Sequence, residues 1–196
     1  MSDQGKTKRQ LQAEQTKIQI FDAAMRLLEK QDFDSITVRD IVREAKVSIG
    51  SFYNYYQSKL DVFYATYQIS DHYFDTVVRS HLTQPTARER ILYFFREYAV
   101  YNSETSIFAL TKVLYNANNT FFHRSGGSGM LSILTELIAQ AVAQGEFRTD
   151  RTPEQLAEFF MICMRGVAYD WCTCNGSYDL KARMDEYMQL LLRAFL

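Results

Sequence analysis

The sequence predicts an all-α protein with an N-terminal three-helix helix-turn-helix domain and a larger C-terminal helical domain, about nine helices in all. Three observations lead to this prediction. Apolar residues recur every three or four positions along most of the chain. Pro and Gly, which interrupt helices, number only 2 and 8 among the 196 residues. Capping boxes precede several of the periodic segments, and no segment alternates as a β-strand would.

The N-terminal domain is expected over residues 1–58, and it starts with a polar tail, residues 1–11, that should fray. A first helix then runs from about Gln12 to Gln31, because apolar side chains return at helical spacing. Its apolar stripe consists of Phe21, Ala24, Met25 and Leu28. This helix would brace the two shorter helices that follow.

Residues 37–59, read TVRDIVREAKVSIGSFYNYYQSK, predict two short amphipathic helices joined by a tight turn. Thr37 and Asp40 have the spacing of a capping box, which starts a helix that ends at about Ala45. Ser48 can accept hydrogen bonds from the backbone N–H groups of the next turn, and it therefore starts the second helix.

The second helix is expected to end at about Tyr55, with Phe52 and Tyr56 facing inward. Gly50 in its first turn would let the backbone approach a phosphate group closely. The hydroxyl and amide side chains left outward can donate to phosphates and base edges. An ordinary helical hairpin has the same spacing, so the residues alone leave a DNA-reading surface and a plain solvated one both open.

From Lys17 to Lys59 the chain resembles the N-terminal domain of TetR-like transcriptional regulators without a gap. The residues that carry the resemblance are Lys17, Ala23, Ala24, Leu27, Leu28, Phe33, Ser35, Ile36, Thr37, Val38, Asp40, Ile41, Ala45, Val47, Ser48, Gly50, Ser51, Phe52, Tyr53, Tyr55, Tyr56, Ser58 and Lys59. The chain departs from the family pattern at Asp32 and Lys46, where Gly is usual. A Lys in the turn between the two helices costs about 1 kcal/mol if its φ is positive, and its charge could add a phosphate contact.

The resemblance implies a sequence-specific transcriptional regulator, by family habit a repressor that a small-molecule effector releases from a double-stranded DNA operator. It assigns base contacts to Tyr53, Asn54 and Tyr55 and phosphate contacts to Thr37, Ser48, Ser51 and Lys59. Arg39 could reach a base or a phosphate, and the DNA-binding surface is completed by Lys46, Ile49 and Gly50.

The C-terminal domain is expected over residues 59–196 as a series of capped helices. Ser58 and Asp61 form a capping box for the first of them, Thr86 and Glu89 form one for the second, and Pro153 stands at a helix start. The expected helices span about 60–82, 86–102, 104–117, 130–144, 153–173 and 179–196, and residues 125–129 are expected to form a loop.

The last two expected helices are apolar around most of their circumference, so each must be buried on more than one side. A homodimer in which they pair with their copies as a four-helix bundle would cover the second side. The predicted interface residues are Phe159, Cys163, Val167, Met184, Tyr187, Met188, Leu191 and Phe195. A monomer that buries both faces internally is the alternative. A dimer would place two recognition helices on a roughly palindromic operator.

Aromatic residues are plentiful in the middle of the chain, which has 13 Tyr and 14 Phe overall. The family resemblance implies a small-molecule cavity there, through which an effector would shift a dimer between two geometries. The predicted lining residues are Tyr67, Phe74, Phe94, Tyr98, Phe108, Tyr115, Tyr169 and Trp171. Aromatic side chains at helical spacing are more often plain core, and that interpretation stays open.

The net charge is −1 overall, but residues 1–60 hold ten Lys or Arg against eight acids, which leaves the N-terminal part at about +2. Three Cys without a secretory leader pattern favour a cytoplasmic protein. No apolar run approaches the roughly 20 residues of a membrane span, so no membrane partner is expected.

An enzyme is not expected, because the chain has neither an H-E-x-x-H pattern nor a nucleophile elbow after a strand. No cofactor or metal is predicted. Two alternatives remain open: a thiol- or metal-responsive regulator that uses Cys163, Cys172 and Cys174, and a helical interaction module without DNA binding.

Overall fold

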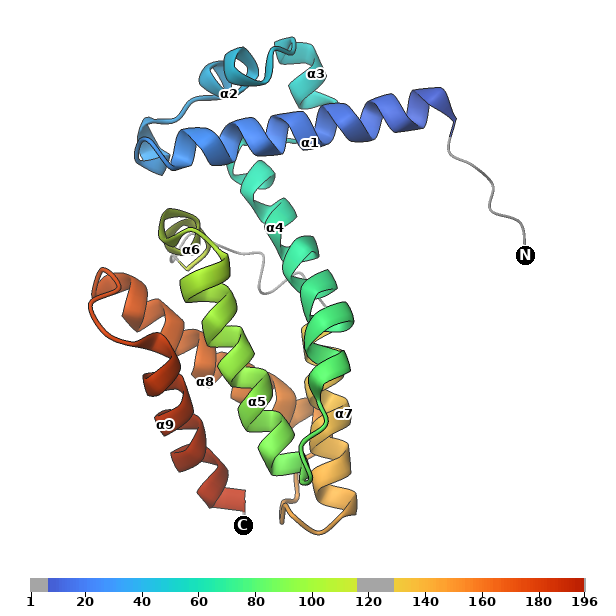
Figure 1. Cartoon of the computed structure of the whole chain (residues 1–196), viewed down its shortest axis with the longest axis vertical. Helices are drawn as coiled ribbons and strands as arrows, with labels where there is room; N and C mark the ends of the chain where they lie inside the picture. The colour runs from blue at the N-terminus through green and yellow to red at the C-terminus, as the bar shows by residue number, and fades with distance from the viewer. Residues whose placement is uncertain (1–6, 116–128, 196) are drawn as a thin grey trace. The chain divides into compact units, whose positions relative to one another are not determined.

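The computed structural model describes residues 7–115 and 129–195, and within them the chain forms helices and turns but no strand (Figure 1). The all-α prediction is therefore confirmed. The α-helices are α1 (Lys8–Leu28), α2 (Val38–Ala45), α3 (Ile49–Tyr53), α4 (Lys59–Tyr73), α5 (Ala87–Val100), α6 (Phe108–Leu114), α7 (Gly129–Ala143), α8 (Pro153–Thr173) and α9 (Leu180–Leu192). None of these helices combines the length and hydropathy that a bilayer crossing requires.

Shorter helical segments of other types adjoin these helices. The 3₁₀ turns are η1 (Phe33–Ser35), η3 (Arg79–His81) and η6 (Arg193–Phe195), and the π-helical turns are η2 (Phe74–Val78) and η4 (Tyr101–Thr105). Because η2 and η3 follow α4 directly, the chain is helical from Lys59 to His81, as the sequence predicted.

The chain forms two compact units, residues 1–66 and residues 67–196, whose boundary falls inside α4 and not at residues 58 and 59. The first turns of α4 belong to unit 1 because Val62 and Phe63 are fully buried. The Phe63 ring lies edge-on to the ring of Phe33, with centroids 5.5 Å apart. Hydrophobic burial thus makes the start of α4 part of the N-terminal core.

Helix α1 begins at Lys8, so the prediction of a flexible tail up to residue 11 is wrong. Thr7 and Gln10 form a capping box: the Gln10 N–H donates to Thr7 Oγ1 at 3.3 Å, and the Thr7 N–H donates to Gln10 Oε1 at 2.8 Å. The box satisfies two N–H groups that the helix end would leave unpaired. Helix α1 ends at Leu28, three residues before the predicted end.

The core of unit 1 lies between α1 and the α2–α3 pair, which runs along one side of α1 in Figure 1. The buried apolar residues of α1 are Ile20, Ala23, Ala24 and Leu28. Phe21 and Met25, which the sequence placed on this stripe, are only half-buried, so the buried face is turned by about one residue from the predicted one.

Unit 2 is built around α5, which packs against α9 on one side and α7 on the other (Figure 1). Helix α8 packs against both α7 and α9. Fully buried aromatic rings of Phe74, Phe94 and Phe95 fill the space beside α5, with the Phe74 and Phe94 centroids 5.0 Å apart. The C-terminal domain therefore has a continuous apolar core of its own.

A long-range carboxylate caps the start of α5. Glu146 accepts from the backbone N–H groups of Ala87 at 2.9 Å and Arg88 at 2.8 Å. Thr86 and Glu89 form the predicted capping box at the same end. The N–H groups that the start of α5 would otherwise leave unpaired are thus bound by the local capping box and by the distant Glu146.

The π-helical turn at residues 101–105 corrects the prediction for the sixth helix. After this turn, Ser106 takes an extended conformation with φ −90° and ψ 150°, and α6 starts only at Phe108. The predicted start near residue 104 is therefore wrong. The predicted loop at 125–128 and the end of the predicted sixth helix lie outside the described residues, whereas Gly129 is the first residue of α7.

Candidate functional site

The start of α2 is set by the predicted capping box. The Asp40 N–H donates to Thr37 Oγ1 at 3.2 Å, and the Thr37 N–H donates to Asp40 Oδ2 at 3.0 Å. The hydrogen bonds from Thr37 lower the pKa of the Asp40 carboxyl, so the box keeps its negative charge at the positive end of the helix dipole. Helix α2 therefore spans 38–45 as predicted.

The turn between α2 and α3 depends on Lys46 in the left-handed conformation, with φ 56° and ψ 39°. The Val47 N–H donates to the Val42 carbonyl at 3.0 Å, which closes α2 as a Schellman motif. Lys46 therefore adopts the conformation that Gly would supply, and its side chain is exposed. At the other departure from the family pattern, Asp32 has an ordinary φ of −64°.

Replacing Lys46 with Gly should raise the free energy of unfolding by about 1 kcal/mol, because the left-handed conformation costs Gly nothing. Urea unfolding followed by circular dichroism at fixed protein concentration measures the change. Lys46→Ala is the matched control, since Ala also lacks the charge but keeps the strain. If both variants were stabilised equally, the cause would be charge and not backbone conformation.

Helix α3 is short and firmly anchored. Ser48 Oγ accepts from the Ser51 N–H at 3.0 Å and so starts the helix as predicted, but the helix ends at Tyr53, two residues early. Phe52 and Tyr56 are buried beneath it, with ring centroids 5.8 Å apart. These two rings hold α3 against unit 1 and leave its other face free.

The predicted DNA-binding residues form one exposed surface over the start of α2, the turn and α3. Thr37, Arg39, Lys46, Ser48, Ile49, Gly50, Tyr53 and Asn54 are exposed, and Ser51 and Tyr55 are half-buried. The nearest atom to a Cβ built on Gly50 would be Ser48 Oγ at 3.8 Å, so the unbound protein has room for a larger residue there. A larger side chain at position 50 would therefore be excluded only by a binding partner that approaches the helix backbone closely.

Lys59 differs from the other predicted contacts. Its Nζ donates to the Phe33 carbonyl at 2.7 Å and lies 4.1 Å from the centroid of the Phe33 ring. The side chain thus ties α4 to η1 inside unit 1 through a hydrogen bond and a cation–π contact. A phosphate could be reached only by its remaining N–H donors.

The predicted effector residues fall into two groups in unit 2. Phe74, Phe94, Tyr98 and Tyr115 are buried beside α5, and the hydroxyl groups of the two tyrosines are hydrogen-bonded to each other. Phe108 and Trp171 pack edge-on at a centroid distance of 4.9 Å. Tyr67 is half-buried. Tyr169 is 47% exposed on α8, so its prediction as a residue that lines an internal cavity is wrong.

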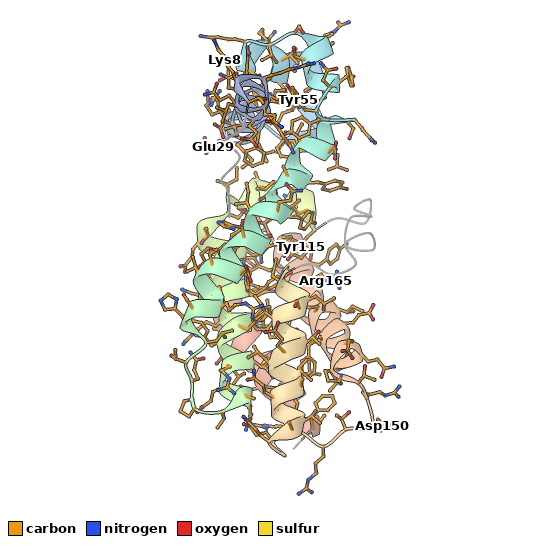
Figure 2. All side chains as sticks on the ribbon, turned by 90° about the vertical axis from the view of Figure 1, so that its right-hand side faces the viewer. Lys8, Glu29, Tyr55, Tyr115, Asp150 and Arg165 are labelled. Atoms are coloured by element: carbon orange, nitrogen blue, oxygen red, sulfur yellow. The ribbon has the colours of Figure 1, made fainter. Side chains whose placement is uncertain are left out.

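The tyrosine pair and Arg165 form a polar centre in this apolar region, and Arg165 was not among the predicted residues. Burial raises the pKa of Tyr98 to about 12 and also raises that of Tyr115, so both hydroxyls remain neutral donors. Arg165 is half-buried, and its charge partly opposes the rise in the pKa of Tyr98. Arg165 and Tyr115 are labelled in Figure 2. The signal in the sequence was an Arg among the apolar residues of α8, between Met164 and Val167.

Three of the eight predicted dimer residues are corrected by their burial. Val167, Met184 and Met188 are buried within unit 2, so they do not form an exposed face. Cys163, Leu191 and Phe195 are half-buried, and Phe159 and Tyr187 are exposed as expected. The large apolar residues exposed on these two helices are Phe159, Ile162 and Tyr169 on α8 and Tyr187 and Leu190 on α9. We call these five residues the α8/α9 face.

The predicted interface did not include Ile162 and Leu190, although helical spacing from Phe159 and Tyr187 points to both. Ile162 is 56% exposed. Gly166, one turn further along α8, has no atom within 4 Å of where a Cβ would stand. Large apolar side chains beside a small residue are typical of a surface against which another helix packs.

The three cysteines do not form a metal site in the described residues, where no group of three or more metal-binding side chains occurs. Cys174 is exposed, Cys163 is half-buried and Cys172 is buried. Burial raises the pKa of Cys172 to about 11 and also raises that of Cys163. Both thiols are thereby less reactive than a free cysteine at neutral pH.

Residues 20–66 match the family described as bacterial regulatory proteins, tetR family. The transcriptional regulator AcrR of Shigella flexneri is 23% identical over 97% of this chain and 93% of its own length. The fatty acid metabolism regulator protein of Bacillus subtilis is 18% identical over 89% of this chain and 93% of its own.

Among solved structures, the fold resembles that of Thermus thermophilus FadR, a TetR-family repressor in complex with lauroyl-CoA. The TM-score is 0.73 at 23% identity, over 90% of this chain and 92% of that one. Bacillus subtilis FadR in complex with stearoyl-CoA gives a TM-score of 0.68 at 18% identity, over 89% and 97%. Residues 20–66 thus match the helix-turn-helix domain of the tetR family, and most of the chain shares the fold of TetR-like regulators.

Proposed function

We propose that the protein is a sequence-specific DNA-binding regulator, which represses transcription as a homodimer until a small-molecule effector releases it. The observation that carries the proposal is the exposed face of α3, which Phe52 and Tyr56 anchor from beneath and Ser48 caps. A rigid, capped helix end with exposed hydroxyl and amide groups can enter a major groove without first ordering itself.

On this proposal, Tyr53, Asn54 and Tyr55 contact bases, while Thr37 and Ser48 bind phosphates through their hydroxyl groups. The remaining phosphate contacts come from Arg39, Lys46, Ser51 and Lys59. Only three of the nine proposed contact residues, Arg39, Lys46 and Lys59, are charged, in keeping with the small positive balance of the N-terminal part. Affinity would therefore depend strongly on a second copy of the same contacts.

The second copy would come from a dimer formed through the α8/α9 face. Five large apolar side chains exposed on two neighbouring helices are more than a monomeric surface usually leaves in contact with water. A two-fold axis through this face would pair α8 and α9 with their copies as a four-helix bundle. Such a dimer would read two half-sites about 34–36 Å apart on a palindromic operator.

For the effector we propose a long-chain acyl-CoA thioester or a compound with a similar apolar chain. Two structural relatives are described in complex with stearoyl-CoA and lauroyl-CoA. In this chain, the buried rings of Phe74 and Phe94 offer apolar surface, and the Tyr98–Tyr115 pair with nearby Arg165 offers polar groups for the other end of the ligand.

The test is fluorescence anisotropy with labelled DNA from the region flanking the protein's own gene, at two salt concentrations, with unrelated DNA of equal length as control. We expect binding that is tighter to the flanking DNA and that weakens as salt rises. Lauroyl-CoA should release the protein, whereas CoA alone should not. Equal affinity for both DNAs would contradict sequence-specific binding, and specific binding without release would contradict only the acyl-CoA effector.

A further inference from the structure

Three tyrosine rings and one carboxylate gather where α4 and α5 both widen into π-helical turns. Tyr73 is the last residue of α4, directly before η2, and Tyr101 is the first residue of η4. Tyr93 and Glu97 lie on the same face of α5 as Tyr101, each separated by four positions. All four side chains are half-buried, so the cluster is reached from the surface.

Tyr73 contacts both Glu97 and Tyr101, and Tyr93 also interacts with Glu97. The Tyr73 hydroxyl donates to Glu97 Oε2 at 3.2 Å, and the Tyr73 and Tyr101 ring centroids are 5.4 Å apart with their planes tilted by 40°. Burial raises the pKa of both Tyr73 and Tyr93, and the nearby Glu97 carboxylate raises both further. Both phenols therefore stay protonated and direct their hydroxyl dipoles toward the same carboxylate.

No basic side chain in the described part of the chain forms an ion pair with Glu97. Other carboxylates of unit 2 do have such partners: Arg79 binds both Asp75 and Glu136, and Lys181 binds Glu104. Among the described residues, the partners of Glu97 are the hydroxyl groups of Tyr73 and Tyr93, and a phenol does not compensate the charge of a half-buried carboxylate. A cation from solution would complete the site.

The aromatic rings around Glu97 indicate which kind of cation would bind there. The faces of Tyr rings attract cations electrostatically, and alkylated ammonium groups suit them because their methyl groups pack against the rings. Metal ions such as Mg²⁺ prefer several oxygen ligands, and this cluster offers one carboxylate. The two π-helical turns are an independent indication, because such turns are rare within α-helices and occur frequently at functional sites.

We propose that Tyr73, Tyr93, Glu97 and Tyr101 form a binding site for a small organic cation that carries a quaternary or tertiary ammonium group. The site uses different side chains from the proposed acyl-chain region at Phe74, Phe94, Tyr98 and Tyr115. It also requires neither DNA nor dimerisation, so it can be tested whether or not the proposed regulatory function is correct.

The test is isothermal titration of the DNA-free protein with choline, next to its neutral isostere 3,3-dimethylbutan-1-ol. We expect saturable binding of choline and no binding of the alcohol, because only choline carries the charge. Glu97→Gln, which keeps the shape of the side chain, should weaken choline binding at least about tenfold. Tyr73→Leu should weaken it about tenfold, whereas Tyr73→Phe, which keeps the aromatic face, should weaken it less than about threefold.

Glu158→Gln, at an exposed position of α8, is the matched control and should bind choline as the parent protein does. Circular dichroism and thermal melting check the fold of each variant, and Tyr101→Leu replaces any variant that does not fold. Equal binding of choline and its neutral isostere would overturn the proposal. So would choline binding that Glu97→Gln leaves unchanged.

Discussion

A protein that carries Ile162→Glu should sediment with the mass of one 22.9 kDa chain, whereas the parent protein should sediment with twice that mass. Ile162 is the most exposed large residue of the α8/α9 face. A dimer formed through this face would bury Ile162 of both chains, so it would also bury two carboxylates without a partner. Burying unpaired like charges costs more than an apolar interface of this kind can offset.

Sedimentation equilibrium at micromolar concentration makes the measurement, with Val142→Glu as the matched control. Val142 is an exposed Val on α7, outside the α8/α9 face, and its change to Glu should leave the dimer intact. Gly166→Arg is a second variant with the same expected result, since it fills the open space on α8. A parent protein that is already monomeric, or an Ile162→Glu protein that stays dimeric, would contradict the proposed interface.

The loss of the dimer should also weaken operator binding by at least about a hundredfold, because each half-site would then bind independently. Anisotropy titration of Ile162→Glu with the operator, next to Val142→Glu, measures this effect. Unit 1 should keep its fold in both variants, because its core lies between α1 and the α2–α3 pair and does not include α8.

Replacing Tyr53 with Ala should weaken operator binding by about tenfold for each half-site, and so about a hundredfold for a dimer on a palindromic operator. Tyr53 is 57% exposed, and its ring is held edge-on against Phe52 at a centroid distance of 5.3 Å. The change removes a preorganised contact but no charge. The salt dependence of binding should therefore keep its slope, whereas Lys46→Ala should lower the slope by about one for each phosphate that Lys46 neutralises in the parent protein.

Anisotropy titrations at several salt concentrations separate these outcomes, and Tyr53→Phe is the control that removes only the hydroxyl. Circular dichroism should show no loss of helix in either variant, because an exposed side chain contributes little to the core. If Tyr53→Ala bound the operator with unchanged affinity and unchanged salt slope, Tyr53 would not be a DNA contact.

Local signals made the helix-turn-helix predictable. The capping box of Thr37 and Asp40 and the N-cap at Ser48 act within three residues, so the sequence pattern alone contains the whole interaction. The φ of Lys46 was left open, because the family pattern has Gly at that position and the chain has Lys; the structure shows that it is positive. The length of α1 was underestimated because its first turns, from Lys8, are polar and lack the apolar periodicity that usually indicates a helix.

Interactions between distant segments were not predictable in the same way. A carboxylate at Glu146 that caps α5 has no signal near Ala87, because 59 positions separate the two residues. The periodicity of α8 and α9 showed that both are apolar nearly all round, but it could not distinguish the side that packs inside unit 2 from the side left exposed. Met184 and Met188 were therefore assigned to the wrong side, and Ile162 was missed.

The cap that Glu146 provides for α5 also has a consequence for the order in which the chain folds during synthesis. Unit 1 involves only residues up to 66, so it can fold early, in keeping with the general tendency of N-terminal domains to fold first. At that stage α5 lacks two of its stabilising contacts. The N–H groups of Ala87 and Arg88 have no Glu146 carboxylate to bind, and the side of α5 that packs against α9 is still exposed. On the proposed function, a nascent chain would thus have a finished α3 well before it could form a dimer, and its binding to DNA would stay weak until α9 has been made.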